Sequence, residues 1–187
     1  MTTESGLETA FPMPKQVVPL RFLVGTWRVE GTLATHGSSF ALRGTVEFYP
    51  AAAGWGILIL NKLHIEGLGW YEEVAILGYN SDDGQVHFFS LTNTGAANDH
   101  KGSWRDATNL ELLYESQQRG RPYREVVLLS VLGPNELTIH EVDTIAGQPE
   151  TTMSVALCRV DWSVPARYKD PANRQHASTR LPYLSRG

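Results

Sequence analysis

Residues 22–33 read FLVGTWRVEGTL, and this stretch decides the fold. A short apolar segment runs into Gly25, and from Trp27 onward apolar and polar residues alternate. Successive side chains on a strand point to opposite faces, so Trp27, Val29 and Leu33 share one face. The pattern predicts a strand that begins at a glycine and turns its tryptophan inward, where the indole closes one end of a β-barrel.

The same alternation recurs along most of the chain. No long segment keeps the 3.6-residue period of a helix, and strand-like runs follow one another at roughly ten-residue spacing. The predicted strands are residues 26–36, 42–50, 55–66, 69–80, 85–92, 100–106, 109–117, 123–132, 136–145 and 150–160. Turn residues separate them, as in NSDDG at 80–84, because Asn, Asp and Gly tolerate positive φ. Short connections in chain order predict an up-and-down antiparallel meander.

A meander of this length leaves two exposed edges unless it closes on itself. We therefore predict an all-β fold, a roughly ten-stranded lipocalin-like barrel over residues 15–160, with two sandwiched sheets as the alternative. Barrels of this size can enclose a ligand. Residues 15–24 are expected to begin with a short helical segment, which Pro19 keeps short. Residues 1–14 are expected to be flexible, and residues 161–187 to form an irregular tail or an arm along the barrel wall.

Composition and charge exclude several classes of protein. Hydrophobic residues make up 42% of the 187 residues and charged residues 19%, which is typical of a globular chain. The net charge of −4 argues against nucleic-acid and membrane-surface partners. The single cysteine, Cys158, excludes an internal disulfide and a cysteine-based zinc site. The chain has neither a secretory apolar run near its start nor a membrane-length one, so we expect a cytoplasmic protein.

The Gly25-x-Trp27 pair after a short helical lead-in resembles the start of lipocalin-like (calycin) barrels. More specifically, residues 18–160 resemble a bacterial lipocalin-like family of undefined function that neighbours the nitrobindins. AILGYNSDDGQVHFFSLTNTG (75–95) and HKGSWRD (100–106) are similar to the middle section of that family. The resemblance implies a closed barrel and does not itself define a function.

The nitrobindins also imply a haem site, and this chain departs from it. Nitrobindins hold haem through a histidine on the last strand, and Met153 stands roughly at that place here. In nitrobindins two glycines follow the tryptophan of the first strand, and here only one of them, Gly31, is present. We therefore expect no cofactor, with haem or nitric-oxide binding as an alternative.

Titratable residues within the predicted strands are candidates for acid–base chemistry. On the fourth strand both faces are half apolar, so either Glu72 or Glu73 could enter the interior, where burial would raise its pKa. On the ninth strand one face carries His140 and the other Glu141 and Asp143. We take Glu72 and His140 as the candidate catalytic residues.

One polar group stands on an otherwise apolar strand face. Burying the amide of Asn61 without a partner would be costly, so it should bond to a neighbour or to a ligand. The candidate ligand-binding residues are Trp27, Asn61, Trp70, Phe88, Trp104, Tyr114 and Met153. The six histidines lack metal-ligand spacing, and we expect no metal site. No nucleophile elbow, phosphate loop or dinucleotide fingerprint is present.

These residues favour a protein that binds a small, largely apolar molecule inside the barrel. The alternatives are a cofactor-independent isomerase, cyclase or hydratase on the same scaffold, a haem or nitric-oxide binder, and a protein that acts through its oligomer surfaces. Residues 55–61 and 123–132 are apolar on both faces. We therefore expect a homodimer.

Overall fold

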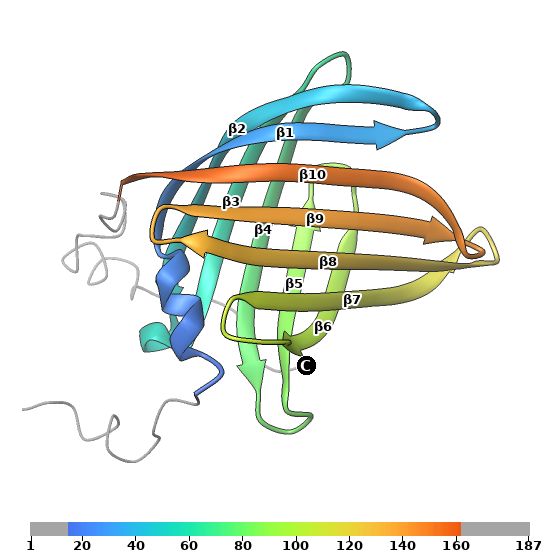
Figure 1. The fold of residues 1–187 in the computed structure, drawn as a ribbon. Helices are drawn as coiled ribbons and strands as arrows, with labels where there is room; N and C mark the ends of the chain where they lie inside the picture. The colour runs from blue at the N-terminus through green and yellow to red at the C-terminus, as the bar shows by residue number, and fades with distance from the viewer. Residues whose placement is uncertain (1–14, 162–187) are drawn as a thin grey trace, which may run out of the picture.

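The computed structural model describes residues 15–161, which form a closed antiparallel barrel of ten strands (Figure 1). The expectations for residues 1–14 and 162–187 lie outside the described residues. The strands are β1 (Gly25–Thr35), β2 (Ser38–Ala51), β3 (Gly56–Ile65), β4 (Gly69–Asn80), β5 (Gln85–Thr92), β6 (Ala97–Trp104), β7 (Asn109–Gln118), β8 (Arg121–Gly133), β9 (Glu136–Ile145) and β10 (Gln148–Asp161). Two short 3₁₀ helices, η1 (Val18–Leu23) and η2 (Ala52–Gly54), complete the order. The predicted fold class is confirmed.

The barrel closes where the first strand meets the last. β1 pairs with β2 on one side and with β10 on the other, with Val29 opposite Leu157 across the closing seam. Every strand therefore has two hydrogen-bonded neighbours, and the alternative of two sandwiched sheets is wrong. Closure satisfies the backbone groups that an open meander would leave at its edges.

Turn chemistry explains why consecutive strands pair so regularly. Four hairpins turn through two residues, and in three of them, at 36–37, 119–120 and 146–147, the second residue is glycine. Both residues of each of these three turns have positive φ, from 49° to 77°. This is the conformation of type I′ turns, whose twist matches that of the flanking strands.

One end of the barrel is plugged by Trp27. The indole is 0% exposed, and its Nε1 donates a hydrogen bond to the carbonyl of Leu23 at the end of η1, at 2.8 Å. Arg159 of β10 covers the ring, its guanidinium carbon 4.0 Å from the ring centroid. The same guanidinium donates hydrogen bonds to the carbonyls of Phe22 and Val24, at 2.5 and 2.6 Å. The helical lead-in, the first strand and the last strand are thus held together at this end.

Glycines precede and follow Trp27 because the chain is crowded there. Gly25 has φ +130°, and a Cβ at this position would lie 2.4 Å from the carbonyl oxygen of Asp161. At Gly31 a Cβ would lie 2.1 Å from the carbonyl oxygen of Ser154 on β10. No side chain fits at either position, which explains why glycines flank the tryptophan in the opening sequence.

Two predicted strands begin three or four residues earlier in the structure. β2 begins at Ser38, four residues before the predicted start, because Ser38 pairs with Thr35 and extends the hairpin with β1. β6 begins at Ala97, three residues before the predicted start, because Ala97 pairs with Leu91 and extends the hairpin with β5. None of the helices in residues 15–161 has the length and apolar character needed to cross a membrane.

Candidate functional site

The barrel encloses a cavity of about 280 Å³ that reaches from the Trp27 end toward the opposite rim. Its inner part is apolar, because the inward positions of most strands carry aliphatic or aromatic side chains. Examples from five strands are Val46, Ile59, Leu110, Leu129 and Leu157. At roughly 30 Å³ for each water-sized group, the space holds about nine non-hydrogen atoms.

Charged groups within the cavity are all acidic. Four carboxylic side chains line it, Glu73, Glu125, Glu141 and Asp143. Among the described residues that line the cavity there is no lysine, arginine or histidine. The lumen therefore combines a largely apolar surface with carboxyl groups at its polar end that no basic lining residue balances.

Three of the carboxyls form one cluster on adjacent strands, which we call the acidic wall: Glu125 on β8 with Glu141 and Asp143 on β9. Glu125 lies directly opposite Asp143 in the β8–β9 register, and Glu141 is the next inward residue on β9. One carboxylate oxygen from each of the three lies within 4.8 Å of the other two. Like charges placed opposite each other on neighbouring strands repel, so this arrangement costs stability unless a proton or another cation is shared.

Glu125 is the member of the acidic wall that neighbouring side chains hold by hydrogen bonds. It is 8% exposed and accepts hydrogen bonds from the Tyr123 hydroxyl at 3.1 Å and from Asn98 Nδ2 at 3.4 Å. Nε2 of His100 lies 2.7 Å from its other oxygen, but off the angle of a hydrogen bond. For Glu141, by contrast, no hydrogen bond is found among the described residues.

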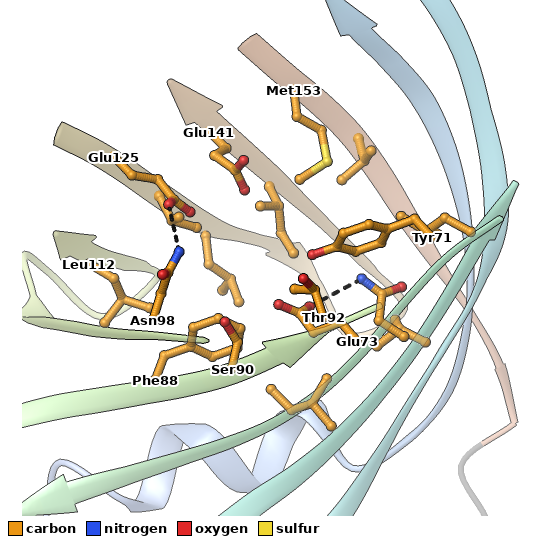
Figure 2. A pocket seen from close by; sticks show the side chains of 18 of the residues that line it. Tyr71, Glu73, Phe88, Ser90, Thr92, Asn98, Leu112, Glu125, Glu141 and Met153 are labelled. Carbon is orange, nitrogen blue, oxygen red and sulfur yellow. Dashed lines mark hydrogen bonds between the residues drawn. The ribbon is translucent and has the colours of Figure 1, made fainter. Parts of the chain in front are cut away.

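The fourth carboxyl stands on the opposite wall. Glu73 on β4 pairs in register with Asn61 on β3, whose Nδ2 donates a hydrogen bond to it at 3.5 Å. Figure 2 shows Tyr71 and Glu73 reaching into the cavity from one side, and Glu125, Glu141 and Met153 from the other. The acidic groups therefore face each other across the lumen.

Burial and mutual repulsion raise the pKa values of these groups. Burial raises the pKa of Glu141 well above its ordinary value, and the neighbouring Glu125 and Asp143 raise it further. Burial, together with Glu125, raises the pKa of Asp143 to about 7. The pKa of Glu73 is also raised by burial, although its hydrogen bond from Asn61 opposes the rise. Near neutral pH the acidic wall thus holds protons that a bound cation could replace.

The cavity meets the outer surface beside the acidic wall. Tyr123 and Asp143 line the cavity and also line a surface hollow next to Arg119 and Arg121 in the β7–β8 turn. Burial and the adjacent Glu125 raise the pKa of the Tyr123 hydroxyl, which stays a hydrogen-bond donor at physiological pH. The polar end of the lumen is therefore the end nearest to solvent.

Both residues taken as catalytic candidates lie on the outer face of the barrel. Glu72 is exposed and pairs with Lys62 at 2.9 Å, so Glu73 is the glutamate of this pair that faces inward. His140 is exposed, and its Nδ1 lies 2.9 Å from the Ser154 hydroxyl on β10. Neither residue lines the cavity.

The predicted ligand-binding residues divide by position. Asn61, Phe88 and Met153 line the cavity, and Trp27 lies beneath it as the plug. Tyr114 packs against His100, with the ring centroids 5.4 Å apart. Trp104 packs against the core, and its indole nitrogen has no hydrogen-bond partner among the described residues. Trp70 points outward and is 59% exposed, because Tyr71 and Glu73 take the inward positions of β4.

The sequence reasoning passed over Glu125, Tyr71 and His100. A signal for Glu125 existed, since Tyr123, Glu125, Val127 and Leu129 alternate along β8 in the same way as Trp27 to Leu33. Glu141 and Asp143 share the inward face of β9 with Leu137 and Ile139, whereas His140, the candidate predicted from the sequence, lies on the outer face.

The class of fold that this architecture defines is a lipocalin-like barrel with an internal cavity. No family model matches the chain, and no curated protein sequence matches it. Among solved structures, Rv2717c from M. tuberculosis superposes with a TM-score of 0.58 at 15% identity, over 80% of this chain and 99% of that one. The S-type phycobiliprotein lyase CPES from Guillardia theta superposes with a TM-score of 0.53 at 11% identity, over 80% and 94%. These likenesses are to the fold.

Proposed function

We propose that the barrel binds one small, largely apolar molecule in its lumen, with the polar end of the ligand at the acidic wall. The observation that carries this proposal is a cavity of about 280 Å³ with an apolar inner part and convergent polar groups at one end. Enclosed cavities of this kind are the usual sites for small ligands. The phycobiliprotein lyase supports the proposal only as a barrel of similar fold.

A matched pair of variants tests lumen binding. On β8, Val127 lines the cavity and its neighbour Val126 points to the outside. Propylbenzene, a neutral probe, is titrated into the protein and followed by backbone amide chemical shifts. We expect saturable shifts at inward positions, loss of binding in Val127→Phe, and unchanged binding in Val126→Phe. Absence of saturable binding to the wild-type protein, or equal loss in both variants, would reject the proposal.

Haem binding, the alternative that the nitrobindin resemblance suggested, fits this lumen poorly. Met153 lines the cavity, but no histidine is among the described lining residues. Four carboxyls line the same space, and they would repel the acidic side groups that haem carries. We therefore infer that the chain is a neighbour of the nitrobindins in fold, with a different ligand. A Soret band that titrates to one haem per chain would overturn this inference.

An acid–base enzyme is the second candidate function. It is favoured by two carboxyls with different surroundings on opposite walls, since Glu73 has a hydrogen bond from Asn61 and Glu141 has only repelling neighbours. Such a pair can supply one proton acceptor and one proton donor. In D₂O, we expect the wild-type protein to exchange the α-protons of acetophenone faster than the Glu73→Gln variant does. Equal rates for the two proteins would remove this candidate.

A further inference from the structure

The acidic wall and the hydrogen-bond capacity of the lumen together identify the chemical class of the ligand. We propose that the lumen selects a small lipophilic amine, with its apolar body in the inner cavity and its ammonium group between the acidic wall and Glu73. This inference rests on the proposed lumen binding and adds the charge of the ligand to it.

The first argument is charge balance. Glu73, Glu125, Glu141 and Asp143 come from three strands on two walls, and no cationic side chain among the described residues lines the cavity. Among the described residues, His100 lies within ion-pair distance of Glu125 and of none of the other three carboxyls. Arg119 and Arg121 border the outer hollow that Asp143 also lines, outside the lumen. A monovalent cation in the lumen would reduce the repulsion within the acidic wall, whereas an anion would add to it.

The second argument concerns unmet hydrogen bonds. Two buried oxygens that line the lumen, Asn61 Oδ1 and Asp143 Oδ1, have no hydrogen-bond partner among residues 15–161. Unpaired buried polar atoms are costly, so they indicate where a ligand supplies the missing partner. Both lining oxygens are acceptors, and an ammonium group offers three donors and no acceptor.

The third argument separates an organic cation from a metal ion. The three oxygens of the acidic wall are close enough to share a divalent cation. However, most of the space beyond them is lined by aliphatic and aromatic side chains, which offer a metal ion no ligands. An ammonium group on an apolar body of about nine non-hydrogen atoms uses both parts of the cavity.

Titratable groups around the site make the selection depend on pH. The groups that face the acidic wall are Tyr71 and Glu73 on β4, His100 on β6 and Tyr123 on β8. Because protons on Asp143 and Glu141 compete with the ammonium, amine affinity should rise as the pH increases from 5.5 to 8. A neutral ligand of the same shape should show no such rise.

The test compares two isosteric probes by isothermal titration calorimetry. 2-Phenylethylamine and 2-phenylethanol differ only in the terminal group. At pH 8 we expect the amine to bind at least tenfold more tightly than the alcohol, and the ratio to shrink toward one at pH 5.5. If the alcohol binds as tightly as the amine at pH 8, the amine proposal fails while lumen binding stands. If neither binds, both proposals fail.

Variants locate the ammonium group. Glu141→Gln and Asp143→Asn should each weaken amine binding about tenfold and leave alcohol binding within twofold. Glu72→Gln, on the outer face of β4, is the matched control and should change neither. Glu73→Gln probes the opposite wall independently of β9, and melting temperatures are measured for all four variants. Amine preference that survives in Glu141→Gln, Asp143→Asn and Glu73→Gln would overturn the assignment. Micromolar binding of Ca²⁺ or Mn²⁺ at the acidic wall that prevents amine binding would also overturn the assignment.

Discussion

Replacing Asp143 by asparagine should stabilise the ligand-free protein, and only above acidic pH. The pKa of Asp143 is raised from 3.8 to about 7 by burial and by Glu125. A gap of about three pKa units corresponds to about 4 kcal/mol at 1.36 kcal/mol per unit. The carboxyl is partly exposed, and solvent screening reduces this to about 1–2 kcal/mol. Asparagine has nearly the same shape and carries no titrating proton.

The pH window follows from the direction of the shift. Below about pH 4 both the folded and the unfolded chain hold the proton, and Asp143 adds no penalty. Between about pH 4 and 7 the unfolded chain releases its proton first, so the free energy of unfolding falls as pH rises. Above about pH 7 the full penalty is present. Asp143→Asn should therefore match the wild type at pH 4 and exceed it by about 1–2 kcal/mol at pH 8.

Urea unfolding at pH 4, 6 and 8, without ligand, measures this difference. Glu136→Gln is the matched control, because Glu136 lies on the same strand and is exposed. Exposed substitutions of this kind usually change the free energy of unfolding by no more than about 0.5 kcal/mol, and we expect the same here. An Asp143→Asn protein that is less stable than the wild type at pH 8, or that gains equally at pH 4, would refute the account of the acidic wall.

Three further outcomes test the fold and its surfaces. Trp27→Ala removes the plug and should lower the free energy of unfolding by about 3–5 kcal/mol, measured by urea denaturation. Gly31→Ala should unfold the protein or lower its melting temperature sharply, whereas Gly78→Ala should be tolerated, since a Cβ at Gly78 would have nothing within 4 Å. We expect the homodimer to form through the outer face of β4 and β5, where Ile76 is 54% exposed. Sedimentation should show a dimer that Ile76→Asp dissociates, and a wild-type monomer at all concentrations would contradict this expectation.

Strand alternation was enough to predict the barrel and its plug. The opening stretch of β1 has one apolar and one polar face, so Trp27 could be placed inward without further information. Asn61 was recognised for the same reason, because it is the polar member of an apolar strand face. Closure of the barrel was predicted from the short hairpins, because the residues of each turn are adjacent in the sequence.

Two features of the site were not predictable in this way. On β4 the outer face carries exposed apolar residues, including Trp70, Val74 and Ile76, so hydrophobicity did not show which face was inside. The acidic wall depends on register between β8 and β9, which brings Glu125 opposite Asp143. Like charges at that distance are unfavourable in isolation, and nothing local to either strand indicates that they meet.

The most direct test of the account is a crystal structure of the protein soaked with propylbenzene, a ligand without charge or hydrogen-bonding groups. We expect difference density for one molecule in the lumen, between Phe88 and Leu112 on one side and Met153 on the other, with the Trp27 plug unmoved. A lumen filled by the protein's own side chains, or density found only on the outer face of the barrel, would contradict the claim that the interior is hollow and accepts a ligand.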